Sequence, residues 1–208
     1  MELDTKRKPL VRTDIINLLI NRHAYRNYLE IGIRKGKNFD AVNCKWKVGI
    51  DPDMSFYKTP MTDNSFLFQT TSNEFFSKNT RLFDIVFVDG LHEFNQVVFD
   101  IKHALFYLKD GGTVVVHDTN PKEEIHQRIP RESKIWNGDV WKAIAYLRYH
   151  NAINLYTVDT DYGVTVIQKH GSPLPRISKI PKDYKDFDLN RNYILNLVSE
   201  EDFLEKMS

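Results

Sequence analysis

Short apolar runs, each followed by polar residues, constrain the fold of this chain more than any other feature. Their apolar side chains are continuous and do not alternate with polar ones, which is typical of strands in a parallel sheet covered by helices on both faces. The five runs span residues 28–33, 46–50, 66–69, 83–88 and 113–117. Segments with helical periodicity lie between them, so the sequence predicts an α/β fold in which strands alternate with helices.

The clearest helical pattern covers residues 94–108, where apolar residues recur at i, i+3, i+4 and i+7. We expect Lys109 and the pair Gly111-Gly112 to end this helix, through a basic last turn and a glycine cap. Thr13 is expected to cap an earlier helix. Shorter helices are predicted after Gly36 and over 139–149. Two last strands, 155–158 and 164–168, are close enough in sequence to form an antiparallel hairpin.

The length of 208 residues suits one domain with a short appendage. We expect a ligand-binding domain over residues 1–171. Prolines and charges mark residues 172–208, for which we predict an extended arm with a short helix near 192–207. We interpret the arm as a segment that only packs against the domain. An oligomer contact and a substrate flap are the alternatives. A homodimer is a further expectation, although no interface is visible in the sequence.

The charge balance excludes several classes of partner. Lys and Arg number 29 and Asp and Glu 28, so a net charge of +1 predicts neither nucleic-acid nor membrane binding. The Lys6-Arg7-Lys8 cluster is too short to change this and is interpreted as a solvated tail. No apolar run reaches the ~18 residues of a membrane span, and no secretory signal is recognised. With Cys44 as the single cysteine, a disulfide within the chain is excluded. We therefore expect a cytoplasmic protein.

Ligands of open α/β sheets bind at the carboxyl ends of the strands. The residues that follow the five runs are Glu30, Gly32 and Gly36; Asp51; 70–73; 89–93; and 117–120. Glu30 stands where a dinucleotide-binding G-x-G-x-x-G motif would begin, and a carboxylate suits a ligand with a positive centre better than it suits a pyrophosphate. Asp51, about 20 residues further on, is placed to accept both ribose hydroxyls. An Asp-Pro turn is the alternative explanation of Asp51.

Seven strings carry a resemblance to a known family: YLEIGIRKG, VGIDPD, TTSNEFF, FDIVFVDGLHEF, GGTVVVHDTNP, WNGDVWKAI and DTDYGVTVI. The chain resembles the class I S-adenosylmethionine-dependent methyltransferases, and within them the methyltransferase 24 family. The resemblance covers roughly residues 28–168. It implies a Rossmann-like methyltransferase fold, with a mostly parallel seven-stranded sheet, helices on both faces and an antiparallel last strand.

The resemblance also implies roles for individual residues. Glu30, Gly32 and Gly36 would frame the methionine part of S-adenosylmethionine, and Asp51 would hold its ribose. Ser72 would border the adenine, and Asp89 would lie near the methionine end and the acceptor substrate. The chain departs from the family at Lys37, where a small residue is usual.

Methyl transfer to an alcohol requires a nearby base or a metal ion, because the hydroxyl loses its proton during attack. The candidate catalytic residues are His117, Asp89 and His92, with Asp118 beside them. In metal-dependent O-methyltransferases an acid after the fourth strand and two ligands after the fifth hold a divalent ion. The resemblance places Asp89, His117 and Asp118 at similar positions. An imidazole in that set favours a softer metal than magnesium.

The sequence thus predicts an enzyme that methylates the hydroxyl of a small molecule or saccharide, an acceptor class that comes from the family and not from the residues. Two other functions remain open: a NAD-binding oxidoreductase, and a catalytically silent Rossmann-like scaffold subunit. Trp141 is expected in the core, whereas Trp136 could belong to the core or line the acceptor site.

Overall fold

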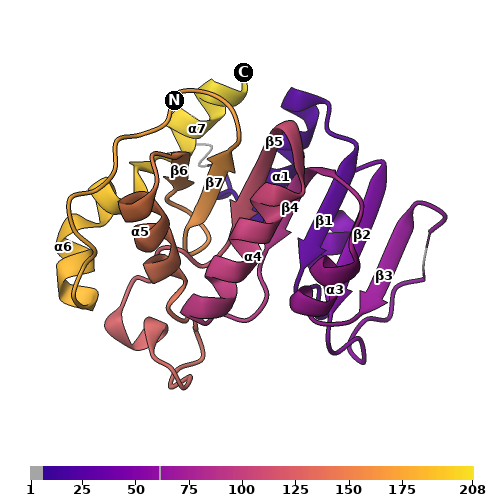
Figure 1. Ribbon diagram of the computed structural model, residues 1–208, viewed down its shortest axis with the longest axis horizontal. Coiled ribbons are helices and arrows are strands. Elements are labelled where there is room, and N and C mark those ends of the chain that lie inside the picture. Colours follow the sequence, from indigo (N-terminus) through magenta and orange to yellow (C-terminus); the bar gives the residue numbers. More distant parts are fainter. Residues whose placement is uncertain (1–6, 61) are drawn as a thin grey trace, which may run out of the picture.

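The computed structural model describes residues 7–60 and 62–208, and it confirms the predicted alternation of strands and helices (Figure 1). The strands are β1 (Asn27–Ile31), β2 (Trp46–Asp51), β3 (Ser65–Gln69), β4 (Phe83–Val88), β5 (Leu108–Val116), β6 (Asn154–Val158), β7 (Val164–Gln168) and β8 (Leu197–Val198). The helices are α1 (Arg12–His23), α2 (Lys37–Ala41), α3 (Ser72–Lys78), α4 (Phe94–Phe106), α5 (Val140–His150), α6 (Tyr184–Leu195) and α7 (Glu200–Met207), with a 3-10 turn η1 (Glu124–Gln127).

The strands form one sheet in the order β3-β2-β1-β4-β5-β7-β6-β8. Neighbours from β3 to β5 pair in parallel, whereas β7 runs antiparallel to both β5 and β6. This arrangement confirms the predicted Rossmann-like sheet with its closing hairpin. The expected seven strands are joined by an eighth, because the two-residue β8 adds in parallel to the outer edge of β6.

Helices cover both faces of the sheet, which explains why the strand sequences are apolar throughout. On one face α3, α4, α5 and α6 pack against alternate strand residues such as Leu29 and Val86. On the other face α1, α2 and α7 cover the intervening residues, among them Ile85 and Phe87. These four strand residues are fully buried, so the sheet is the centre of two hydrophobic layers.

The start of α1 differs from the prediction that Thr13 caps it. The helix begins two residues earlier, after Val11, whose backbone N–H donates to the Asp14 carboxylate at 3.0 Å. Thr13 lies inside the helix, and its hydroxyl donates to Asn38 at 2.6 Å. An acid in the first turn has therefore taken the role expected of the threonine.

The end of α4 also differs from the prediction. The helix stops at Phe106, and Lys109, Gly111 and Gly112 belong to β5. The Lys109 Nζ lies 2.9 Å from Asp84 Oδ1 on the neighbouring strand β4. The glycines therefore mark an irregular entry into a long strand and not a helix cap, a use of glycine that the sequence pattern does not distinguish.

The C-terminal segment holds two helices, α6 and α7, where one short helix near 192–207 was predicted. Asn196, with a φ of +47°, ends α6, so the chain can enter β8 and then α7. Buried Arg148 of α5 donates to the carbonyls of Tyr193 and Ile194, each at 3.2 Å. The segment is thus built onto the sheet and α5. At the other terminus Arg7 pairs with Glu200 at 2.9 Å, while Lys6 of the basic cluster lies outside the described residues.

Within the described part of the chain, no helix combines the length and the apolar character needed to cross a bilayer.

Candidate functional site

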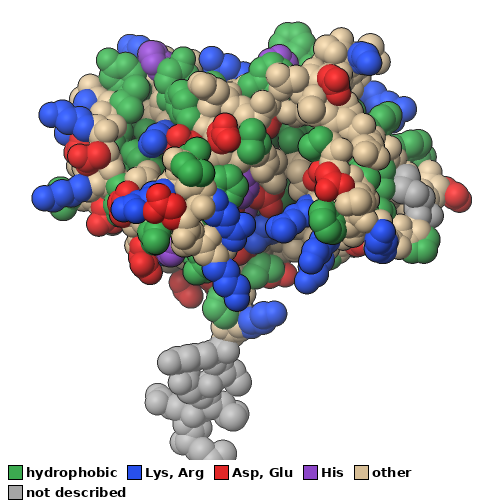
Figure 2. Space-filling view, turned by 90° about the horizontal axis from the view of Figure 1, so that it is seen from below, with side chains coloured by type: hydrophobic (Ala, Val, Ile, Leu, Met, Phe, Trp, Pro, Cys, Tyr) green, Lys and Arg blue, Asp and Glu red, His purple; other side chains and the backbone are tan. Residues whose placement is uncertain are grey.

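The carboxyl ends of β1, β4 and β5 meet at one edge of the sheet, which Figure 2 views face on. The backbone ladder continues one residue past each strand. Asp89 N–H donates to the Ile31 carbonyl at 3.0 Å, and His117 N–H donates to the Val88 carbonyl at 3.1 Å. Main-chain hydrogen bonds therefore fix where the Asp89 and His117 side chains leave the sheet, before any side chain is considered.

Gly32 allows the β1 and β4 ends to approach closely. Its φ is +89°, and a Cβ at this position would lie 2.3 Å from the carbonyl oxygen of Asp89. An L side chain is therefore excluded both by the backbone conformation and by the neighbouring main chain. Gly32 is thus required for packing at the edge of the site, and its predicted contact with a cofactor remains a prediction.

Asp89 is the centre of a charged cluster. Its Oδ1 lies 3.2 Å from His117 Nδ1 and 3.2 Å from His92 Nε2, and its Oδ2 accepts from Arg12 at 3.0 Å. Burial opposes ionisation of this carboxyl, but the attraction and hydrogen bond of His117, reinforced by His92, hold its pKa well below its usual range. Asp89 is therefore a carboxylate throughout the physiological pH range.

His117 is enclosed, with both ring nitrogens facing acceptors. Nδ1 lies 3.2 Å from Asp118 Oδ2 in addition to Asp89, and Nε2 lies 2.8 Å from the carbonyl oxygen of Asp161. Burial lowers the pKa of a histidine, but here the charges of Asp89 and Asp118 outweigh it and raise the pKa of His117 well above 6.5. With 3% of its surface exposed, His117 is a buried imidazolium held by three aspartates.

His92 is the more accessible of the two imidazoles. Its Nδ1 lies 3.4 Å from Asp118 Oδ2, and its ring stacks on Trp136 with the centroids 5.2 Å apart. Asn137 donates to the other oxygen of Asp118 at 2.6 Å, so the loop before α5 orients both partners. Burial opposes protonation, yet the hydrogen bond and charge of Asp89 raise the pKa of His92 above its ordinary value. Trp136 thus borders the cluster, while Trp141 is buried against Phe187 as predicted.

A cavity of about 460 Å³ opens beside this cluster, between the ends of β1, β2, β3 and β4. Asp51, Ser72 and Asp89 line it, as do Gly32 and the segment 89–91. Asp51 accepts from the backbone N–H of Arg34 and of Asp53, both at 2.8 Å, so it closes the turn and also faces the cavity. Both readings of Asp51, as turn residue and as cavity residue, therefore have structural support.

Five residues that the sequence grouped with this site lie outside the cavity lining: Glu30, Gly36, His92, His117 and Asp118. Glu30 is buried on the opposite side of β1, where it accepts from Tyr28 and, at 2.9 Å, from Asn38. Gly36 precedes α2 and packs against the Tyr57 ring. The other three belong to the cluster around Asp89. The cofactor contacts predicted for Glu30 and Gly36, and the catalytic or metal-binding roles predicted for the other three, remain predictions.

The similarity of this chain to a known protein family lies in the strands that form the site. Residues 29–119 match a family described as a methyltransferase domain, a stretch that runs from β1 to the turn after β5. This match covers less than half of the 208 residues. The mostly parallel sheet with its antiparallel closing strand agrees with the Rossmann-like methyltransferase fold expected from the sequence.

Solved structures share the methyltransferase fold at low sequence identity. A putative caffeoyl-CoA O-methyltransferase from Staphylococcus aureus is 16% identical over 78% of this chain and 86% of its own, with a TM-score of 0.60. The methyltransferase PaMTH1 from Podospora anserina, bound to SAH, is 16% identical over 80% and 81%, with a TM-score of 0.62. TomG, an O-methyltransferase from Streptomyces achromogenes bound to SAM, is 17% identical over 77% and 80%, with a TM-score of 0.55. A search of curated proteins found no match.

Two members of the charged cluster, Arg12 and Asp161, are not among the predicted site residues. Arg12, the first residue of α1, donates through Nε to Asp161 at 2.8 Å and through Nη1 to Asp89. Asp161 lies in the turn of the hairpin between β6 and β7, with a φ of +45°. The string DTDYGVTVI held the signal for Asp161. Nothing in the sequence indicated Arg12, which lies far from the other members along the chain.

The donor set for a metal differs from the predicted one. Single ligand atoms of Asp89, His92 and Asp118 lie within 4.8 Å of one another, and they form the candidate group. His92 takes the place expected for His117, whose Nε2 is already bonded to the hairpin. Two carboxylates and an imidazole fit a divalent ion that tolerates nitrogen ligands.

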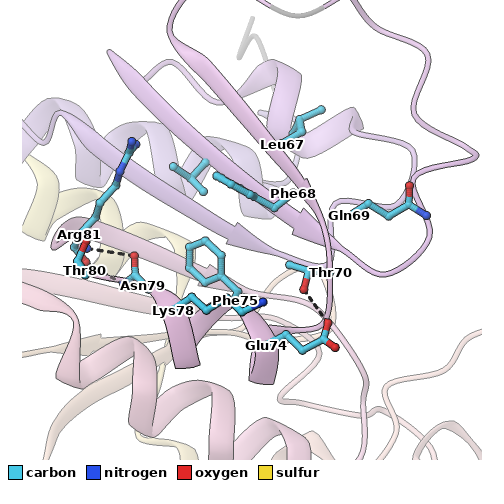
Figure 3. A pocket seen from close by; sticks show the side chains of 11 residues that line it. Leu67, Phe68, Gln69, Thr70, Glu74, Phe75, Lys78, Asn79, Thr80 and Arg81 are labelled. Carbon is cyan, nitrogen blue, oxygen red and sulfur yellow. Dashed lines mark hydrogen bonds between the residues drawn. The ribbon is translucent and has the colours of Figure 1, made fainter.

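A second cavity, of about 470 Å³, lies along the outer edge of the sheet between β3 and α3 (Figure 3). Phe68 and Phe75 form its apolar walls, and Lys78 and Arg81 lie at its rim. Thr70, which lines both cavities, donates to Glu74 at 2.8 Å. This cavity carries no paired acid and imidazole, so the cluster around Asp89 remains the candidate reaction centre.

Proposed function

We propose that the chain is an S-adenosylmethionine-dependent O-methyltransferase acting on a hydroxyl of a small molecule, with a saccharide-like acceptor as the first class to test. The observation that carries the proposal is the position of the Asp51-lined cavity directly beside the Asp89, His92 and Asp118 cluster. A cofactor bound in the cavity would therefore meet an acceptor at a site equipped to handle a proton.

The residues around the cavity suit this cofactor. Asp51 offers carboxylate oxygens to the ribose hydroxyls, and Gly32 lets a ligand approach the main chain after β1. Ser72 lies at the N-terminus of α3 and lines the cavity, where it would border the adenine ring. S-adenosylmethionine supplies the electrophilic methyl group, and the protein supplies orientation and an environment for the nucleophile.

We assign proton removal to His92, because it is the more exposed imidazole and stacks on Trp136 at the border of the cluster. A neutral His92 would accept the acceptor's hydroxyl proton, and the carboxylates of Asp89 and Asp118 would stabilise the resulting imidazolium. His117, enclosed by three aspartates, contributes fixed positive charge and holds Asp89 in place. Asp89 itself is proposed to orient His92 and the acceptor.

A divalent ion is the alternative way of activating the hydroxyl. Asp89, His92 and Asp118 would hold it, and it would polarise the acceptor oxygen as a Lewis acid. Arg12 already lies 3.0 Å from Asp89 Oδ2, so the ion would share this carboxylate with a guanidinium.

The first test is calorimetric titration with S-adenosylhomocysteine, with and without Mg²⁺ or Mn²⁺. We expect micromolar binding by the wild type and a loss of about 1–3 kcal/mol in Asp51→Ala, the usual cost of removing a hydrogen-bonding carboxylate from a ligand contact. Asp110→Asn, at a fully exposed carboxylate distant from the cavity, is the matched control and should bind as the wild type does.

Titration with NADH separates this proposal from its alternatives. Binding of NADH without binding of S-adenosylhomocysteine would favour an oxidoreductase. Binding of neither ligand, with or without metal, would leave a scaffold subunit as the remaining function.

Replacement of His92 tests the assignment of the base. We expect His92→Gln to lower kcat by about 100-fold or more, because general-base catalysis contributes about 10²–10⁴-fold. The measurement is S-adenosylhomocysteine production against a panel of catechols, phenols and saccharides. Unchanged turnover, with cofactor affinity also unchanged, would remove His92 from the reaction.

A further inference from the structure

The second cavity, between β3 and α3, takes no part in the proposed reaction. Among the described strands β3 is the outermost on this side of the sheet, and α3, which follows it, has only 7 residues. The short helix covers its face of β3 only in part, so Phe68 keeps 43% of its surface exposed. The volume of about 470 Å³ that remains is that of an ordinary small-molecule site.

Aromatic side chains from β2, β3 and α3 border this edge of the sheet. Phe68 packs on Phe75 of α3, with the ring centroids 5.7 Å apart. Phe66, on the same face of β3, stacks on Trp46 of β2 at 6.4 Å. A third cavity, of about 320 Å³, is lined by Phe66 and Trp46, and it shares Arg81 with the second. The two adjoining cavities suit a flat apolar molecule, because aromatic walls favour contact with a hydrocarbon or an aromatic ring.

Arg81 lies where the second and third cavities adjoin. Its guanidinium lies over the Phe66 ring, 5.2 Å from the centroid. Asn79 fixes the main chain at this position, since its side chain accepts from the Arg81 N–H at 3.1 Å and donates to the Arg81 carbonyl at 2.9 Å (Figure 3). The loop and the ring therefore hold this positive charge beside the cavities before any ligand binds, which lowers the cost of ordering it on binding.

The charges that line the second cavity favour an anion. Lys78 and Arg81 both line it, and neither is among the ion-paired cations of residues 7–60 and 62–208. Glu74 is the one acid in the lining, and its carboxylate already accepts from Thr70 at 2.8 Å. Figure 3 shows Thr70 and Glu74 at one end of the cavity and Arg81 at the other. An anionic group at the Arg81 end would thus meet positive charge that no carboxylate offsets.

We propose that the second cavity, together with the adjoining third, binds an apolar organic acid. Its flat hydrocarbon body packs against Phe66 and Phe68, and its carboxylate pairs with Arg81 and Lys78. The planar guanidinium presents N–H donors that match the two oxygens of a carboxylate. The second cavity shares only Thr70 with the lining of the Asp51-lined cavity, so the site is separate from the proposed reaction centre. The inference therefore does not depend on the proposed function.

The test compares the affinities of 2-naphthoate and 2-naphthamide by calorimetry at pH 7.5, because these probes share their shape and differ in charge. We expect the wild type to bind 2-naphthoate about 10-fold more tightly, the combined effect of two exposed ion pairs that are each worth a few-fold. In the double variant Lys78→Gln and Arg81→Gln the preference should fall to below about 2-fold. Phe68→Gln removes an apolar wall and should weaken the binding of both probes by about 10-fold.

The matched control is the double variant Arg176→Gln and Lys185→Gln, which removes the same charge from exposed positions outside both cavity linings and should keep the wild-type preference. Lys78, Arg81 and Phe68 are exposed, so their replacement is expected to leave the fold intact.

Three results would overturn the inference. The first is that the wild type binds neither probe, or binds both equally. The second is a preference for 2-naphthoate that survives the loss of both cations, since the probe would then occupy another site. The third is a wild-type dimer, measured by sedimentation, that dissociates in Phe68→Gln, because a second copy of the chain would then cover this edge of the sheet.

Discussion

Gly32→Ala is expected to lower the free energy of unfolding by more than about 3 kcal/mol and to abolish S-adenosylhomocysteine binding. A Cβ at this position would lie 2.3 Å from the Asp89 carbonyl oxygen and 2.7 Å from Gly90 Cα. Both are main-chain atoms at the end of a central strand, so neither can move without disturbing β4. The φ of +89° adds conformational strain for any L side chain.

Gly111→Ala is the matched control for this prediction. Gly111 has a similar φ of +77°, but a Cβ there would have no atom within 4 Å. It therefore carries the conformational cost, about 1 kcal/mol, without the collision. Urea unfolding of both variants measures the difference. Equal stabilities would mean that the β1 and β4 ends can separate at little cost, and the close approach would not be a determinant of the site.

The fold was predictable because burial on both faces of a parallel sheet leaves long apolar runs in the sequence. Errors arose where local signals compete. Gly111 and Gly112 have the same pattern as a helix cap but form the entry to β5, and Thr13 is a better cap by residue type than Val11. Pairing with the neighbouring strand β4 decided the first boundary, whereas a local capping contact between Val11 N–H and Asp14 decided the second.

The site was predictable where strand ends carry it and unpredictable where helices do. Asp89, His92, His117 and Asp118 follow β4 and β5 directly, so their proximity follows from the parallel ladder. Arg12 of the charged cluster and Asp100 of the cavity lining come from α1 and α4, and only the packing of those helices brings them to the sheet edge. A helical pattern gives the buried face of a helix, but it does not tell which polar residue on that face meets a cavity.

Glu30→Gln is expected to remove a pH dependence from the stability of the protein. Burial raises the pKa of Glu30 to about 8, although hydrogen bonds from Tyr28 and Asn38 favour its ionised form. In the unfolded chain the pKa of glutamate is about 4.3. The folded state therefore holds the proton more tightly, so the stabilisation is complete below about pH 4 and is lost as the pH rises to 8.

The size of the effect follows from the linkage between protonation and folding. Each pH unit between the two pKa values costs up to about 1.4 kcal/mol, and we expect a total of about 2–4 kcal/mol by pH 8.5. Glu30→Gln cannot ionise, so its stability relative to the wild type should increase from pH 5.5 to 8.5 in urea unfolding. Glu74→Gln, at an exposed helix position where hydrogen bonds lower the pKa of the carboxyl, should show a constant difference over this range. A constant difference for Glu30→Gln as well would mean that Glu30 is not buried as an acid.

The same variant decides between two roles for Glu30. The family resemblance implies that its carboxylate frames the methionine part of the cofactor, whereas in the structure the carboxyl is enclosed by Tyr28 and Asn38 outside the cavity lining. At pH 7 a carboxyl with a pKa of about 8 is mostly protonated, so replacement by the neutral Gln changes little. We therefore expect S-adenosylhomocysteine affinity to remain within about 3-fold of the wild type, since the lost contact would be internal. A loss of 10-fold or more with unchanged stability at this pH would mean that cofactor binding reaches Glu30, and that the β1–α2 turn rearranges to expose it.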